Sequence, residues 1–171
     1  DAYDSTELAA FVERSRDVGT PVLVDEAFLG FTDRPSLAGT EGVIVARSLT
    51  KLFGLPGLRA GFAVATGSLL ERLEAARRTW NMGWPAIQAG MHSMQDRAFV
   101  SETRERVAAE RGRMADTLSQ RYTVAPSDAP FLMLQVEDVA VDTVIRRARE
   151  DGMVLRDART FRGLDEHVRV D

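Results

Sequence analysis

The chain has 171 residues, of which 44% are hydrophobic and 28% charged, a composition that excludes collagen-like, low-complexity and disordered proteins. Its net charge of −4 argues against nucleic acid as a partner, and no apolar run approaches the ~20 residues that a membrane-spanning helix needs. Because cysteine is absent and the two histidines, His92 and His167, lie far apart, we expect neither a disulfide nor a metal site.

The first half of the chain predicts helices that alternate with short strands. A helix begins after the capping residue Asp4 and ends at Gly19. Three continuous apolar runs predict strands, at residues 21–24, 43–45 and 61–65. The first of these runs has the pattern of a strand buried on both faces, and residues 68–78 predict another helix. This order fits a segment of an α/β sheet.

The second half predicts a smaller α+β unit that follows a long charged helix. Pro85 suits the first turn of a helix that runs to about Gln95, and the charged helix spans roughly Arg97 to Arg121. Its interleaved Arg and Glu residues favour a solvent-exposed helix with i,i+4 ion pairs over a basic nucleic-acid-binding face. The unit then comprises a strand at 131–136, a helix at 141–150, and strands at 153–156 and 168–170.

Both ends of the sequence indicate a segment of a longer protein. Residue 1 is Asp rather than Met, and residues 168–171 have the pattern of a strand that stops midway. The sequence shows no signal peptide, and the expected compartment is the cytoplasm.

Lys51 is the single lysine among 22 basic residues, and its neighbours indicate a phosphate-binding site with a reactive amine. Ser48 offers a hydroxyl and Arg59 a planar cation, the two groups that suit a phosphate dianion. A lysine amine between phosphate ligands can form a Schiff base with an aldehyde that also carries a phosphate.

Asp25 supplies a complementary group. It ends a buried strand, where open α/β sheets place their ligand contacts. A carboxylate there would keep a pyridine nitrogen protonated, so that the ring could accept electrons from a substrate carbanion.

Two stretches, residues 24–28 and 48–62, resemble the pyridoxal-phosphate enzymes of the class I/II aminotransferase family, which have fold type I. The resemblance implies that residues 1–96 are the C-terminal part of the large α/β domain. Residues 97–171 would then be the linking helix and the truncated small α+β domain. It also implies pyridoxal 5′-phosphate as cofactor and a homodimer in the full-length protein. Several residues that complete the family's site lie before residue 1, so we expect the isolated segment to bind the cofactor poorly.

Carried over position by position, the resemblance assigns a role to five residues. Asp25 would pair with the pyridine nitrogen, and Lys51 would form the internal aldimine. Ser48 and Arg59 would hold the cofactor phosphate. Arg169 would bind the α-carboxylate of the substrate.

Two branches of the family look similar to this sequence, threonine-phosphate decarboxylase and histidinol-phosphate aminotransferase, and both act on phosphorylated amino compounds. Phe28 stands where aminotransferases of this group usually have a tyrosine that hydrogen-bonds the cofactor, whereas the decarboxylase has phenylalanine. Residues 47–51 and 161–165 also resemble the decarboxylase, which is therefore the first choice and would act in cobalamin synthesis.

Other features leave the substrate and the reaction open. Pro130 stands where both branches usually have asparagine, which leaves room for a third specificity. Arg156 and Arg159 are candidates for contacts with a substrate phosphate, with surface charge as the alternative reading. Decarboxylation and transamination differ in which α-carbon bond lies perpendicular to the ring, and the sequence does not determine this. A remote alternative is the cofactor-binding sensor domain of a transcription regulator, for which an N-terminal winged helix would argue.

Overall fold

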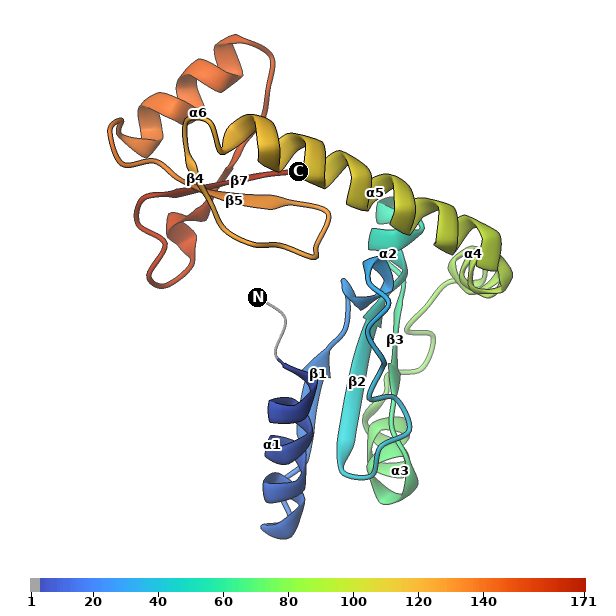
Figure 1. The fold of residues 1–171 in the computed structure, drawn as a ribbon. Helices are drawn as coiled ribbons and strands as arrows, with labels where there is room; N and C mark the ends of the chain where they lie inside the picture. Colours follow the sequence, from blue (N-terminus) through green and yellow to red (C-terminus); the bar gives the residue numbers. More distant parts are fainter. Residues whose placement is uncertain (1–3) are drawn as a thin grey trace. The chain divides into compact units, whose positions relative to one another are not determined.

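A computed structural model describes residues 4–171, which form two compact units, one ending at Arg104 and the other spanning Glu105–Asp171 (Figure 1). Each unit has its own sheet and its own apolar core. Within residues 4–171, no helix is long and apolar enough to cross a membrane, and no group of acidic and histidine side chains could hold a metal ion.

The unit that ends at Arg104 is built on a three-stranded sheet. Its elements in chain order are α1 (Ser5–Asp17), β1 (Val22–Asp25), the 3-10 helix η1 (Leu29–Phe31), β2 (Val43–Ser48), α2 (Leu49–Leu52), the 3-10 helix η2 (Pro56–Leu58), β3 (Gly61–Val64), α3 (Gly67–Ala76), α4 (Trp84–Gln95) and the first part of α5 (Arg97–Leu118). The strands lie in the order β1-β2-β3, with β1 parallel and β3 antiparallel to β2. The expected α/β class is confirmed.

Helix α1 begins and ends as its sequence predicts. The Asp4 carboxylate accepts hydrogen bonds from the backbone N–H groups of Thr6 (2.8 Å) and Glu7 (3.2 Å), which the first turn leaves without helical partners. Beyond the last turn, Gly19 has a φ of +69°, a conformation that a β-carbon disfavours.

The prediction that the first strand is buried on both faces is wrong. Val22 and Val24 pack against the core that contains Val12 and Val45, whereas Leu23 between them is 69% exposed. Successive side chains of a strand point to opposite faces, and β1 is an edge strand of this sheet. Only the face toward α1 is covered, so the continuous apolar run leaves one large side chain in solvent.

The unit Glu105–Asp171 is a four-stranded antiparallel sheet packed on helices. Besides the rest of α5, it contains β4 (Thr123–Val124), β5 (Leu132–Gln135), α6 (Val141–Glu150), β6 (Arg156–Asp157), the 3-10 helix η3 (Ala158–Thr160) and β7 (His167–Val170). The strand order is β4-β5-β7-β6. Leu132, Leu134 and Val168 form the buried face, against which α5 packs with Leu118 and α6 with Ile145.

The strand expected at 153–156 is shorter and lies later, as the two-residue β6. Gly152 follows α6 with a φ of +81°, and the N–H of Met153 donates back to the carbonyl of Ala148 at 2.8 Å. This helix-ending turn takes up the start of the apolar run, and Val154 is 84% exposed. A run of apolar residues therefore did not by itself identify a strand here.

Candidate active site

Three of the predicted site residues lie at one edge of the first sheet. Asp25 is the last residue of β1 and pairs with Ala46, and Ser48 ends the parallel strand β2. Ser48 pairs in turn with Gly61, the first residue of β3, and Arg59 comes two residues before it. The carboxyl ends of β1 and β2 and the start of β3 thus bring Asp25, Ser48 and Arg59 to the same edge.

Lys51 lies at this edge on the short helix α2. Ser48 caps that helix: its hydroxyl oxygen accepts from the N–H of Thr50 at 3.3 Å and lies 2.8 Å from the Thr50 hydroxyl. The Lys51 side chain is exposed, and its Nζ lies 5.6 Å from the centroid of the Phe28 ring. The Lys51 amine therefore lies within the range of a cation–π interaction with Phe28.

The packing of α2 holds Lys51 in place. Leu49 is buried, and a β-carbon on Gly90 of α4 would lie only 2.6 Å from its Cδ1. Leu52 also approaches Gly30 closely, where a β-carbon would lie 2.9 Å from its Cδ2. The absence of side chains at these two glycines allows both leucines to approach closely, which fixes the helix that carries the lysine.

Arg59 has an uncommon backbone conformation. It follows η2 with a φ of 50° and a ψ of 40°, in the left-handed region that residues other than glycine seldom adopt. The neighbouring carbonyl of Ala60 accepts a hydrogen bond from the N–H of Leu49 at 3.1 Å, which ties this turn to α2. This conformation costs a residue with a β-carbon about 1–2 kcal/mol. Such strain concentrates at functional sites, which makes Arg59 a functional candidate on independent grounds.

The charged groups at this edge do not neutralise one another. Within residues 4–171, no ion pair involves Asp25, Lys51 or Arg59. One Asp25 oxygen, Oδ1, accepts from the N–H of Ala27 at 2.9 Å, which orients the carboxylate. An anionic group that also carries a protonated nitrogen would provide partners for all three side chains.

One residue beside these was missed by the sequence reasoning. Glu26 is only 5% exposed and forms an ion pair of 2.8 Å with Arg47. The sequence signal was a second carboxylate directly after Asp25, but the pattern alone did not show which of the two is buried.

Arg169 and Arg156 belong to the other unit, where they are neighbours. The two residues pair directly across β7 and β6, so their side chains lie on the same face of the sheet. The guanidinium of Arg169 lies 4.8 Å from the centroid of the Phe131 ring and donates to Asp171 at 2.8 Å. Its Nε is buried and has no hydrogen-bond partner within residues 4–171.

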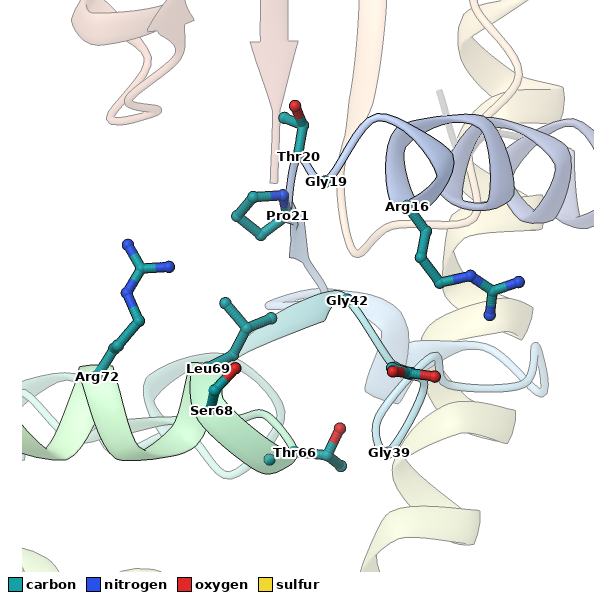
Figure 2. Close-up of a pocket in the computed structure, with 12 residues that line it drawn as sticks. Arg16, Gly19, Thr20, Pro21, Gly39, Gly42, Thr66, Ser68, Leu69 and Arg72 are labelled. Carbon is teal, nitrogen blue, oxygen red and sulfur yellow. The ribbon is translucent and has the colours of Figure 1, made fainter.

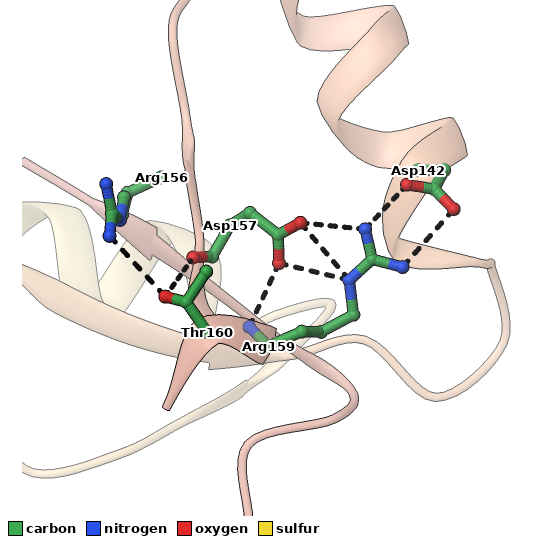
Figure 3. A network of polar contacts seen from close by, with 5 residues as sticks. All are labelled: Asp142, Arg156, Asp157, Arg159 and Thr160. Carbon is green, nitrogen blue, oxygen red and sulfur yellow. Dashed lines mark hydrogen bonds and ion pairs between the residues drawn. The ribbon is translucent and has the colours of Figure 1, made fainter. Parts of the chain in front are cut away.

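Arg159 is occupied, in contrast to Arg156 (Figure 3). Its guanidinium donates to both oxygens of Asp157 and both oxygens of Asp142, with shortest distances of 2.7 and 2.6 Å. These hydrogen bonds raise the pKa of Arg159, and those from Arg159 lower the pKa of Asp157 to about 2. Among the described residues, Arg156 donates a single hydrogen bond, of 3.4 Å to Thr160, so it is the more available of the two arginines for a phosphate.

A pocket of the first unit lies away from this edge (Figure 2). It measures about 510 Å³ and is lined by Thr20 and Gly42, which come just before β1 and β2, and by Thr66 and Gly67 after β3. These are the ends of the strands opposite to the edge that carries Lys51. None of the predicted site residues lines the cavity, so it is not the candidate active site.

Comparison with known proteins identifies the family. The family model of the class I and II aminotransferases matches residues 1–171. The chain belongs to this family. It is 31% identical over 169 residues to a Caldanaerobacter subterraneus protein provisionally named threonine-phosphate decarboxylase, an alignment that covers 94% of this chain and 46% of that protein. It is 32% identical over 176 residues to the histidinol-phosphate aminotransferase of Halobacterium salinarum, covering 96% of this chain and 46% of that protein.

Solved structures share the fold. Histidinol-phosphate aminotransferase from Clostridium acetobutylicum superposes with a TM-score of 0.90 at 22% identity, over 98% of this chain and 53% of that one. The enzyme from Sinorhizobium meliloti, solved in complex with pyridoxal-5′-phosphate, has a TM-score of 0.85 at 20% identity, over 99% of this chain and 48% of that one. The chain thus spans about half the length of the relatives it matches.

Pyridoxal 5′-phosphate is the cofactor of this family. The residues at the sheet edge fit it, because an oriented carboxylate, an exposed lysine amine and an arginine lie there without ion-pair partners in the described part of the chain.

Proposed function

We propose that the full-length protein is a pyridoxal-phosphate-dependent enzyme that acts on a phosphorylated amino acid, with L-threonine O-3-phosphate decarboxylase as the first choice. Membership of the class I and II aminotransferases supports the cofactor and the enzyme class. The resemblance to the decarboxylase branch supports a role in cobalamin synthesis. A cytoplasmic homodimer is part of the same proposal.

The residues of the first unit would hold the cofactor, which when bound supplies an electron sink for the bond-breaking step. Lys51 Nζ would attach it covalently and then move a proton at the substrate α-carbon. The Asp25 carboxylate, already oriented by the N–H of Ala27, would accept a hydrogen bond from the ring nitrogen. The Ser48 hydroxyl and the Arg59 guanidinium would bind the phosphate.

The two neighbouring arginines of the second unit would bind the substrate. The resemblance to the family supports the assignment of Arg169 to the α-carboxylate. Arg156, on the same face and nearly free of competing acceptors, would contact the substrate phosphate. Arg159 is not assigned a role because Asp142 and Asp157 already take up its donors.

Phe28 is the residue on which the preference for the decarboxylase over the aminotransferase rests. Its ring lies 5.6 Å from Lys51 Nζ, so a residue at this position is close to the reacting lysine. A tyrosine there could donate a hydrogen bond to the cofactor, as the resemblance implies for the aminotransferases, whereas phenylalanine has no donor. The absence of that hydroxyl favours the decarboxylase.

Histidinol-phosphate aminotransferase remains the second candidate. The relative with that name is 32% identical to the chain and the relative named as a decarboxylase 31%, so identity does not separate the two reactions.

The deciding experiment uses the full-length protein, loaded with pyridoxal phosphate and supplied with L-threonine O-3-phosphate but no keto acid. The proposal predicts steady release of carbon dioxide over many turnovers. If carbon dioxide is not released but histidinol phosphate is converted once 2-oxoglutarate is added, the second candidate replaces the first. If neither substrate reacts, both substrate assignments are wrong.

A further inference from the structure

Glu26 is the most deeply buried acidic side chain in the described part of the chain, and no step proposed so far uses it. Its Oε2 accepts from Arg47 Nε at 2.9 Å, from Arg47 Nη2 at 2.8 Å and from the Ser36 hydroxyl at 2.7 Å. Its Oε1 accepts from the N–H of Leu37 at 2.8 Å. The carboxylate is thus fully hydrogen-bonded inside the protein.

Such a pair is poorly explained as a source of stability. Glu26 is removed from water while Arg47 stays 29% exposed, and burying a charge is costly enough that apolar side chains of similar size often give an equally stable fold. The Arg47–Glu26 pair does, however, define geometry, because an arginine that donates two hydrogen bonds to one carboxylate oxygen leaves both side chains little freedom.

The pair lies directly beside the groups that are assigned to the cofactor. Glu26 follows Asp25, and its N–H donates to the carbonyl of Ala46 at 2.9 Å, which extends the β1–β2 ladder beyond its last pair. Arg47 precedes Ser48 in β2, so the two side chains lie on opposite faces of the strand. The ion pair therefore joins the carboxyl ends of β1 and β2 from the face opposite to Ser48.

The contacts with Ser36 and Leu37 add a second constraint. They attach the chain that returns from η1 toward β2 to the same carboxylate, and η1 directly follows Phe28. Asp25 is thus fixed on both sides. The β1–β2 pairing holds the strand that it ends, and the hydrogen bonds of Glu26 hold the loop that follows.

We infer that Glu26, through its ion pair with Arg47, is a positioning residue that sets the place of Asp25 against the ring nitrogen of the bound cofactor. This inference rests on the proposed function. It predicts that a loss of the charge on Glu26 reduces the rate through Asp25 and leaves substrate binding nearly unchanged.

The test is a double-mutant cycle in the full-length holoenzyme. It is followed by single-turnover rates and by the pH midpoint of the visible absorption band of the bound cofactor, which Glu26→Gln should shift only where Asp25 is present. Glu26→Gln is expected to lower kcat roughly 10-fold to 100-fold, because a misplacement of about 1 Å near reacting groups can cost that much, with KM within about twofold. In an Asp25→Asn background, the same substitution is expected to change the rate by less than about twofold. The control Glu110→Gln breaks an exposed ion pair of 2.8 Å with Arg113 and is expected to have no effect.

Arg47→Lys provides a second route if Glu26→Gln does not fold. It keeps the cation but loses the two-point contact, and the same cycle with Asp25→Asn applies. An equal loss of rate in both backgrounds would show a general structural role for Glu26 and overturn the inference alone. If the unsubstituted parent shows no visible absorption band from a lysine-bound cofactor, both the proposed function and this inference are wrong.

Discussion

Substituting Arg59 by glycine and by alanine separates the role of its backbone from that of its guanidinium. Both substitutions remove the cation, but only glycine relieves the left-handed conformation at φ 50° and ψ 40°. That conformation costs a residue with a β-carbon about 1–2 kcal/mol. The greater freedom of glycine in the unfolded chain offsets about 0.4–1 kcal/mol of this gain. From the middle of both ranges, we therefore expect the glycine variant to be more stable than the alanine variant by about 0.8 kcal/mol.

The expected effect on the cofactor is the same for both variants. A hydrogen bond to a charged group contributes about 1.5–3 kcal/mol, and each 1.4 kcal/mol corresponds to a factor of ten in affinity. Loss of the guanidinium should therefore weaken binding of pyridoxal phosphate roughly 10-fold to 100-fold. Arg77→Ala removes another exposed arginine of the same unit and serves as the control, with unchanged affinity.

The assay combines two measurements on the full-length protein. Titration of the apoprotein with pyridoxal phosphate, followed by visible absorbance, gives the affinity. Urea unfolding of the same apoprotein gives the stability. Wild-type affinity in Arg59→Ala would refute the assignment of Arg59 to the phosphate. A glycine variant no more stable than the alanine variant would refute the argument from backbone strain.

Four further outcomes are expected. Borohydride reduction of the holoenzyme should attach the cofactor to Lys51, and Lys51→Ala should abolish both the visible band and the activity; a label found by mass spectrometry on another residue would contradict the site. Asp25→Asn should retain the cofactor, as judged by absorbance, while kcat falls by orders of magnitude; a rate near that of the wild type would argue against its contact with the ring. Arg169→Ala should raise the KM for the amino acid at least roughly 10-fold, the cost of a charged hydrogen bond, whereas Arg159→Ala should leave KM unchanged in the same steady-state assay. Arg159 lowers the pKa of Asp157 to about 2, so the ionised Asp157 carboxylate contributes to stability above its ordinary pKa near 3.8, and this contribution is lost as the pH falls through about 2. Unfolding curves of Arg159→Ala should therefore differ from those of the wild type at pH 5 and converge with them near pH 2.

Much of the first unit could be predicted because its signals are local. Asp4 and Gly19 delimit α1, and the apolar runs locate β1 and β2, since helix capping and the apolar pattern of a strand depend on residues close together in the sequence. The runs also place Asp25 and Ser48 at the ends of strands. The parallel pairing of β1 with β2, which brings these ends to one edge, joins residues 21 positions apart and was decided by the fold.

Local patterns failed where a neighbouring element decides. The apolar run after α6 begins as a helix-ending turn at Gly152, and Leu23 is exposed because no described element covers its face of β1. Neither outcome is encoded in hydrophobicity alone, since burial depends on what packs against a side chain.

The sequence by itself determined which chemical groups are available: one lysine, an aspartate at the end of a strand, and arginines suited to phosphate and carboxylate. The tertiary structure decided which of these are already occupied. Glu26 is paired with Arg47, 21 residues away, and Arg159 is paired with Asp142 and Asp157. Asp25, Lys51 and Arg59 form no such pair within residues 4–171. An ion pair forms only where the fold brings two charges within about 4 Å, and that distance depends on strand register and helix packing rather than on the identity of either residue.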